Sequence, residues 1–297
     1  MFQRVQFLTQ WFVWKWILNF KRSLFYHLQF SNIGPAKKYV KQLKNEGILI
    51  LNIEDLLDSR GLELVHEVRQ FSQTELNQEY VQKALRGQNS ISEGNFFLLS
   101  LLPNEFYSKD PFVLLAIHPK ILAFVNQYFG MAGLLRAIRL WLNFPTDSES
   151  KETQLWHRDS DDLVNLKVFI YLNDVNQNNG PFCFIRKTHP FGSLHIKPQL
   201  NENGRVSDEE MNKCILKKDR LHCLGPEGTI IFADTCGYHK GLKPLQGHRL
   251  LLMIQYTSGR PRTGKTMRIK NIENATLSME QKFALGVLGG EKDPDAF

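Results

Sequence analysis

Three residues in the second half of this sequence could together hold a metal ion. His157 and Asp159 lie two positions apart, and His239 follows much later in the chain. Two imidazoles and one carboxylate on one face of an octahedral ion leave three positions open, an arrangement typical of non-haem Fe(II) oxygenases. These residue types therefore predict an iron centre with room for a cosubstrate and O₂.

The spacing of the first two residues favours a shared ion if the chain is extended there. In a β-strand, residues i and i+2 point to the same side, so His157 and Asp159 would face one ion while Arg158 points away. The third ligand must come from a distant strand, and the apolar run 228–234 ends shortly before His239. A His-x-Asp pair or a lone histidine is more often structural, so the order of pair, strand and histidine carries the prediction.

A basic residue follows the third predicted ligand. Arg249 lies ten positions after His239 and begins the apolar run 250–254. A guanidinium is a planar fork that binds a carboxylate at two points. Arg249 is therefore a candidate for binding the distal carboxylate of 2-oxoglutarate.

From Leu155 to Pro190 the sequence resembles the phytanoyl-CoA dioxygenase family of Fe(II)- and 2-oxoglutarate-dependent oxygenases, and the resemblance extends through His239 and Arg249 to about Gly259. It is carried by Leu155-Trp156-His157-Arg158-Asp159, by the run from Leu166 to Val175, and by Asn178-Asn179-Gly180-Pro181-Phe182. One departure is Lys187-Thr188-His189, where family members usually have Gly-Ser-His.

The resemblance implies a mainly β fold with flanking helices around a double-stranded β-helix core of the jelly-roll, cupin-like type. It also implies Fe(II) and 2-oxoglutarate as cofactors, with His157, Asp159 and His239 as the metal ligands and no catalytic residue beyond the metal site. Because Asp159 is kept, where related halogenases have a small residue, the expected reaction is hydroxylation of an unactivated C–H bond with release of succinate and CO₂. Desaturation or ring closure are alternatives at such a site, and the substrate is expected to be a small or lipid-like molecule.

Two further residues are candidates for binding the cosubstrate. The resemblance points to Asn143, and the alternative is a buried asparagine that ties backbone groups together. Lys167 shares one face of its strand with Phe169 and Tyr171, and a lysine inside a β-barrel is costly unless it is paired with an anion. That face meets either the cosubstrate carboxylate or solvent.

The length of 297 residues allows one large oxygenase domain after an N-terminal arm. A polar excursion between Thr188 and Leu224 would either lie over the iron or be a surface insertion. Apolar spacing predicts the following elements: a strand at 48–51, helical structure from 54 to about 85 broken at Gly61, and a helix over 111–128. The expected units are an arm at 1–45, a domain at 46–297, a helical buttress at 46–130 and a jelly-roll core at 134–258.

The hydrophobic fraction of 42% and the charged fraction of 23% are those of an ordinary folded protein. The four cysteines form no Cys-x-x-Cys pair, which argues against a zinc ribbon and a secreted disulfide scaffold. Reduced thiols in a cytoplasmic enzyme are the expectation.

The net charge of +7 is concentrated in the N-terminal arm. Residues 1–45 contain eight basic and no acidic side chains, whereas the remainder contains 29 basic and 30 acidic ones. The near-neutral remainder argues against a nucleic-acid partner. The basic residues of the arm are Arg4, Lys15, Lys21, Arg22, Lys37, Lys38, Lys41 and Lys44.

The arm is also rich in aromatic residues, among them Trp11, Trp14 and Trp16. This mixture suits the surface of an anionic membrane, so peripheral contact is one prediction. The alternatives are a helix packed by its aromatics on the barrel, a subunit contact, and recruitment of an anionic substrate. Polar residues interrupt every apolar run too early for a membrane span. A signal peptide is not expected either, because the positive region at the start is thin and the aromatic run ends in Lys21-Arg22 instead of a small-residue cleavage site.

Two rival functions remain open at this point. A non-catalytic, cupin-like protein could hold a metal or a sugar in the same barrel, but it would have no need for Arg249. An oxygenase acting on a nucleic acid or a protein would normally surround its site with positive charge, which the sequence after the arm lacks.

Overall fold

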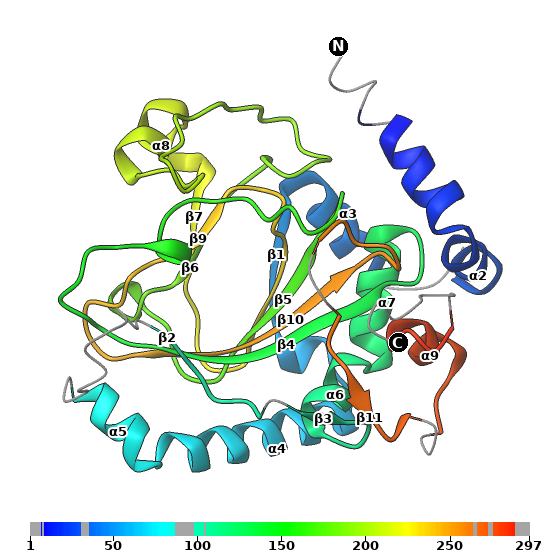
Figure 1. Ribbon diagram of the computed structural model, residues 1–297, viewed down its shortest axis with the longest axis horizontal. Helices are drawn as coiled ribbons and strands as arrows, with labels where there is room; N and C mark the ends of the chain where they lie inside the picture. The colour runs from blue at the N-terminus through cyan, green and yellow to red at the C-terminus, as the bar shows by residue number, and fades with distance from the viewer. Residues whose placement is uncertain are drawn as a thin grey trace.

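The computed structural model describes residue 7 and residues 9–30, 36–86, 98–103, 105–263, 266–272 and 276–288. Its centre is a six-stranded antiparallel sheet in the order β1-β8-β5-β10-β4-β2. A three-stranded antiparallel sheet, β7-β6-β9, faces it (Figure 1). The strands of these two sheets are β1 Ile48–Asn52, β2 Leu98–Ser100, β4 Leu134–Asn143, β5 Leu166–Tyr171, β6 Phe182–Ile185, β7 Arg220–Cys223, β8 Thr229–Asp234, β9 His239–Gly241 and β10 Arg249–Thr257.

Helices cover the face of the large sheet that points away from the small sheet, and α8 lies beyond the small sheet (Figure 1). The strands β3 Phe106–Tyr107 and β11 Ile269–Lys270 form a separate parallel pair. The helices are η1 Val13–Leu18, α2 Phe20–Phe30, α3 Ala36–Glu46, η2 Ile53–Asp55, α4 Ser59–Leu76, α5 Glu79–Leu85, α6 Pro111–Ala116, α7 Pro119–Phe129, η3 Glu152–Gln154, η4 Gln177–Asn179, α8 Asp208–Cys214, η5 Lys217–Asp219 and α9 Met279–Ala284.

The central strand β10 is buried along its whole length because both of its faces are covered. Leu250, Leu252 and Ile254 pack in the cluster that includes the helices. The alternate residues Leu251 and Met253 pack between the two sheets. A strand buried on both faces reads in sequence as a continuous apolar run, which is what residues 250–254 show.

The predicted strand at 48–51 is confirmed as β1, and the predicted strand-rich region after residue 134 contains β4 to β10. The predicted break at Gly61 is wrong, because Gly61 lies in the first turn of α4, where its N–H donates to the N-cap side chain of Asp58 at 3.0 Å. A Cβ at Gly61 would lie 2.9 Å from Cβ of Leu57, so the glycine permits close packing rather than ending the helix.

The single helix predicted over 111–128 is also corrected, because two helices, α6 and α7, occupy this region. His118 is extended between them, with φ −63° and ψ 132°, and precedes Pro119 at the first turn of α7. The residue before a proline is disfavoured in the helical conformation, so the chain turns at this position.

The N-terminal arm packs partly on the rest of the molecule. Trp14 is buried, and its indole Nε1 donates to Asp162 Oδ1 at 2.7 Å. Trp11 makes edge contacts with Phe191. The predicted packing of aromatics on the barrel is therefore seen for these residues, whereas Arg4 lies outside the described residues.

Candidate functional site

The two candidate histidine ligands lie side by side because their backbones pair. The N–H of His157 donates to the carbonyl of His239 at 3.0 Å, and the N–H of His239 donates back at 2.9 Å. The segment around His157 forms only isolated bridges and not the regular strand expected. The two imidazole centroids are 4.2 Å apart.

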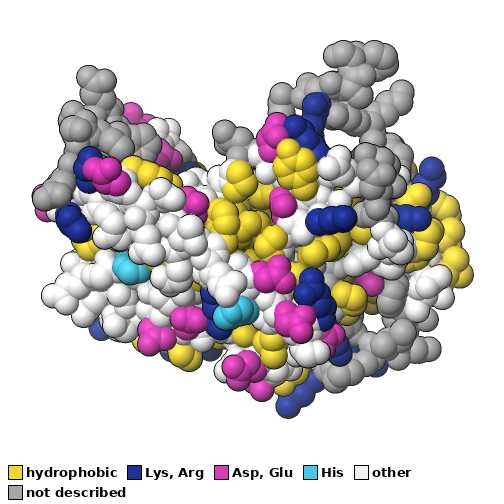
Figure 2. Space-filling model, turned by 90° about the horizontal axis from the view of Figure 1, so that it is seen from below, with side chains coloured by type: hydrophobic (Ala, Val, Ile, Leu, Met, Phe, Trp, Pro, Cys, Tyr) yellow, Lys and Arg dark blue, Asp and Glu magenta, His cyan; other side chains and the backbone are white. Residues whose placement is uncertain are grey.

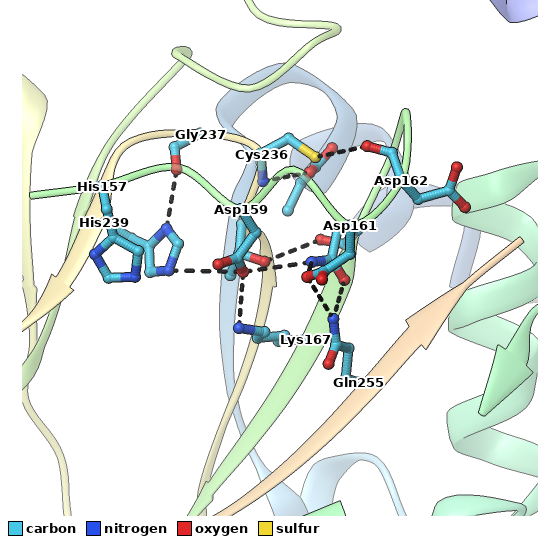
Figure 3. A network of polar contacts seen from close by, with 12 residues as sticks. His157, Asp159, Asp161, Asp162, Lys167, Cys236, Gly237, His239 and Gln255 are labelled. Atoms are coloured by element: carbon cyan, nitrogen blue, oxygen red, sulfur yellow. Dashed lines mark hydrogen bonds and ion pairs between the residues drawn. The ribbon is translucent and has the colours of Figure 1, made fainter. Parts of the chain in front are cut away.

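Asp159 completes the cluster from the same extended segment. One ligand atom from each of His157, Asp159 and His239 lies within 4.8 Å of the others (Figure 3). The N–H of Asp159 donates to the carbonyl of Thr235 at 2.8 Å, which fixes the segment beside the loop that leads into β9. The His-x-Asp pair and the distant histidine thus meet at one point.

Backbone carbonyls fix the orientation of both imidazoles. Nδ1 of His157 lies 2.8 Å from the carbonyl of Leu155, and Nδ1 of His239 lies 3.0 Å from the carbonyl of Gly237. Because a carbonyl only accepts hydrogen bonds, each Nδ1 carries the proton. Each Nε2 therefore keeps its lone pair for a metal.

The electrostatics of the cluster favour the ligand forms of all three side chains. Burial, together with the neighbouring His239, lowers the pKa of His157 to about 2. Burial lowers the pKa of His239 to about 4, although Asp159 opposes this shift. Burial alone would raise the pKa of Asp159, but Lys167 and His239 hold it below its usual value. Two neutral imidazoles and one carboxylate are therefore present at neutral pH, a donor set that fits Fe(II) and similar divalent ions.

A polar network surrounds Asp159 on the side away from the histidines (Figure 3). Lys167 Nζ lies 2.7 Å from Asp159 Oδ2. Asn165 Nδ2 donates to Asp159 at 3.3 Å and to Asp161 at 3.1 Å. Gln255 Nε2 donates to both Asp161 and Asn165 at 3.1 Å. The network joins the candidate metal ligand to strands β5 and β10, where Lys167 and Gln255 pair in register.

Arg249 is a buried cation without a counter-anion among the described residues. Its Nη1 donates to the carbonyl of Gly180, and its Nη2 donates to Asn143 Oδ1 at 3.1 Å. Its Nε has no hydrogen-bond partner, and no described carboxylate forms an ion pair with it. A buried guanidinium held only by neutral oxygens fits an acidic ligand.

The strand that carries His239 brings this guanidinium into the same site. Gly241 lies two residues after His239 on β9, so both positions lie on one face of the strand. A Cβ at Gly241 would lie 2.8 Å from Nη2 of Arg249. The missing side chain at Gly241 leaves space for the guanidinium next to the strand of the candidate ligand.

The two remaining candidates from the sequence, Asn143 and Lys167, contact Arg249 and Asp159, respectively. Asn143 pairs in register with Arg249 across β4 and β10, and its side chain holds the guanidinium. Lys167 contacts Asp159 instead of solvent. Sequence reasoning missed Asp161, Asn165 and Gln255. For Gln255 a signal was available in the sequence. The period of two along the strand places Gln255 on the same face as Arg249, which is a polar side chain on the inner face of an apolar strand.

The excursion between Thr188 and Leu224 contacts the back of the ligand segment. Val206 pairs with Trp156 in an isolated bridge. Asp208, at the start of α8, accepts a hydrogen bond from the indole of Trp156 at 2.7 Å. It also forms an ion pair of 2.7 Å with Lys240. Trp156 and Lys240 each neighbour a candidate metal ligand in sequence, so the excursion supports the site from outside.

No protein-family model matches the sequence, and no curated protein matches it. Among solved structures, AviO1 from Streptomyces viridochromogenes Tue57 aligns with a TM-score of 0.52 at 12% identity, over 79% of this chain and 99% of that one. EctD from S. alaskensis, crystallised with 2-oxoglutarate and 5-hydroxyectoine, aligns with a TM-score of 0.50 at 16% identity, over 79% and 80%. SnoK, a non-haem α-ketoglutarate-dependent carbocyclase of nogalamycin biosynthesis, aligns with a TM-score of 0.50 at 16% identity, over 78% and 86%. At these identities the likeness shows a shared fold, and this chain therefore has the fold of these proteins.

Proposed function

We propose that this chain is an Fe(II)- and 2-oxoglutarate-dependent dioxygenase that hydroxylates an unactivated C–H bond of a small or lipid-like molecule. One observation carries the proposal. His157, Asp159 and His239 form a metal-binding cluster, and the strand of His239 passes next to Arg249, a buried guanidinium that lacks an anion among the described residues. A site that held only a metal would have no use for this cation.

The residues have separate roles in this proposal. His157, Asp159 and His239 would hold Fe(II) through two Nε2 atoms and one carboxylate. Arg249, held in place by Asn143, would bind the distal carboxylate of 2-oxoglutarate at two points. Iron and 2-oxoglutarate would supply the oxidising chemistry, in which 2-oxoglutarate, O₂ and the substrate C–H bond give succinate, CO₂ and an alcohol.

The apolar side chains packed between the two sheets support an apolar substrate. Phe169, Phe182 and Met253 pack there, and Phe182 lies 5.7 Å from His239 between ring centroids. Apolar side chains near the metal ligands would exclude water from the reacting C–H bond and leave orientation of the substrate to a few polar groups.

The proposal includes membership of the phytanoyl-CoA dioxygenase family, which residues 155–190 resemble. It also includes a jelly-roll arrangement of the two sheets. The names of the structural neighbours support it, because SnoK is called α-ketoglutarate-dependent and EctD was crystallised with 2-oxoglutarate. We also propose that residues 46–297 form one oxygenase domain.

The test is succinate release by the purified chain with Fe(II), 2-oxoglutarate and a panel of carboxylate, lipid and sugar candidates. Turnover should require Fe(II), should increase with a true substrate, and should be lost in Asp159→Ala. Metal binding without binding of 2-oxoglutarate in anaerobic titration would overturn the proposal and favour a non-catalytic, cupin-like metal or sugar binding protein.

A further inference from the structure

One side of the N-terminal segment 9–30 packs on the rest of the chain and is hydrogen-bonded to it. Trp14 is only 4% exposed and donates to Asp162. Asn19 Oδ1 accepts the N–H of Gly259 at 3.0 Å. Arg22 Nη1 donates to the carbonyls of Ala132 and Gly133, each at 3.1 Å. Tryptophan and arginine side chains of this segment are therefore used for internal packing.

The outer side of the same segment is apolar. Ile17, Phe20 and Leu28 are 62%, 52% and 76% exposed. Phe20, Leu24 and Leu28 are spaced four residues apart on α2, as on one side of a helix, and Ile17 lies on η1 just before it. Of sixteen exposed large hydrophobic side chains in the described part of the chain, seven fall within residues 12–28. Such concentration on a protein surface marks an interaction site.

Exposed cations lie within this segment and shortly after it along the chain. Lys21 is exposed on α2, and Lys37, Lys38 and Lys41 are exposed on α3. α3 begins at Ala36, six positions after α2 ends at Phe30, so its lysines follow the segment closely along the chain. In Figure 2, apolar side chains gather at the right-hand edge, the side on which α2 lies in Figure 1, with basic side chains beside them.

The charge distribution favours one of the two partners that could bind the apolar row, which are a second copy of this chain and a lipid bilayer. Residues 1–45 contain eight basic and no acidic residues, so a second copy of this chain would oppose cation to cation. An anionic bilayer surface offers phosphates to the lysines and an acyl boundary to the apolar row. No helix in the described ranges is long and apolar enough to cross a membrane, which fits contact at the surface.

We propose that the outer side of residues 12–28 docks this protein on an anionic lipid bilayer. Ile17, Phe20, Leu24 and Leu28 enter the headgroup boundary, and Lys21, Lys37, Lys38 and Lys41 meet lipid phosphates. The proposal goes beyond the dioxygenase activity and does not depend on it. The hydrogen bond from Trp14 to Asp162, three residues after Asp159, fixes the docked segment to the site.

The experiment is flotation of the full-length protein with vesicles of phosphatidylcholine, with or without phosphatidylserine, at low and high salt. Binding is expected only to the anionic vesicles and is expected to weaken at high salt. The double variant Leu24→Gln, Leu28→Gln should bind about tenfold or more weakly. The triple variant Lys37→Gln, Lys38→Gln, Lys41→Gln should lose most of the salt-sensitive binding.

The matched control is Leu216→Gln, Leu245→Gln, which replaces two exposed leucines outside the segment and should bind like the unaltered protein. Thermal midpoints of all variants check that folding is unchanged. Absence of the protein from anionic vesicles at low salt overturns the proposal, and so does an equal loss in the control. A dimer in sedimentation that Leu24→Gln, Leu28→Gln dissociates identifies a second copy as the occupant and also overturns it.

Discussion

The ammonium of Lys167 and the carboxylate of Asp159 form an ion pair of 2.7 Å inside the candidate metal site. The same Oδ2 atom of Asp159 lies 3.8 Å from Nε2 of His239. A divalent ion bound by this cluster would therefore come close to the lysine, and the two cations would compete for one carboxylate. Binding of a metal would therefore make Lys167 available to a second anion.

Lys167→Met should separate metal binding from cosubstrate binding. Because repulsion between cations is removed, the variant should bind Fe(II) or Mn(II) at least as tightly as the unaltered protein. It should bind 2-oxoglutarate about tenfold or more weakly, because one charge-assisted contact is lost. Anaerobic titration of metal and then of 2-oxoglutarate measures both. Weaker metal binding with unchanged cosubstrate binding would show that Lys167 only orients Asp159.

His239→Ala should lose most of the affinity for Fe(II), because it removes one of the three proposed ligands and the ring packed against His157. The check is anaerobic metal titration, followed by elemental analysis of the loaded protein. His66→Ala, which changes an exposed histidine on α4, is the matched control and should bind metal normally. Retention of one equivalent at unaltered affinity in His239→Ala would remove it from the ligand set.

Arg249→Lys should weaken 2-oxoglutarate binding by about 1 to 3 kcal/mol while leaving metal affinity intact, since lysine cannot form the two-point contact. Calorimetric titration of 2-oxoglutarate into the metal-loaded protein gives this value. An unchanged dissociation constant would mean that the cosubstrate carboxylate does not contact Arg249.

Asn143→Ala distinguishes a direct contact with the cosubstrate from support of the guanidinium. If Asn143 acts only by holding Arg249, its substitution should weaken 2-oxoglutarate binding in the unaltered protein and add almost nothing in Arg249→Lys. A double-mutant cycle on the dissociation constants measures this coupling. Additive losses would instead assign Asn143 its own contact with the cosubstrate.

Glu280→Gln should stabilise the protein in a pH-dependent way. Burial raises the pKa of Glu280 to about 7, although Asn126 donates a hydrogen bond to it at 2.6 Å. Between the ordinary pKa of a glutamate, 4.5, and about 7, the folded state therefore binds a proton that the unfolded state has released. The free energy of unfolding falls as pH rises through this interval. The variant should gain about 1 to 2 kcal/mol at pH 8, after allowance for partial exposure, and almost nothing at pH 5. Denaturant unfolding at both pH values measures the gain, and an equal gain at both would exclude ionisation as its cause.

Local patterns in the sequence were sufficient for β1 and β10 and for naming the three side chains that meet at the cluster, although the segment around His157 forms isolated bridges instead of the regular strand expected. His157 and Asp159 follow the period of an extended chain, and β10 is a continuous apolar run. The prediction that was wrong depends on contacts between residues that the local pattern does not show. Gly61 was predicted to end a helix, but its N–H is capped by Asp58, and its missing Cβ permits contact with Leu57.

The network around Asp159 and the division of the N-terminal arm could not be predicted from local patterns. Asp161 and Gln255 are far apart in sequence and meet only because β5 and β10 pair in one register. Trp14 and Phe20 are both large aromatics in one basic segment, yet Trp14 is buried against Asp162 and Phe20 is exposed. Composition left membrane contact and packing on the barrel as alternatives for the arm, and only the tertiary contacts show which side chains are buried and which are exposed.

The strand order of the large sheet also determines when the protein can fold during synthesis. β1 pairs only with β8 in this sheet, where Ile48 meets Ala233, and β5 lies between β8 and β10. A nascent chain that ends before residue 229 therefore exposes the apolar edges of β1 and β5 with neither neighbour available. Such non-local pairing folds slowly and exposes aggregation-prone edges. Emergence of β8 and β10 from the ribosome, and protection of the chain until then, should limit the yield of folded protein in expression.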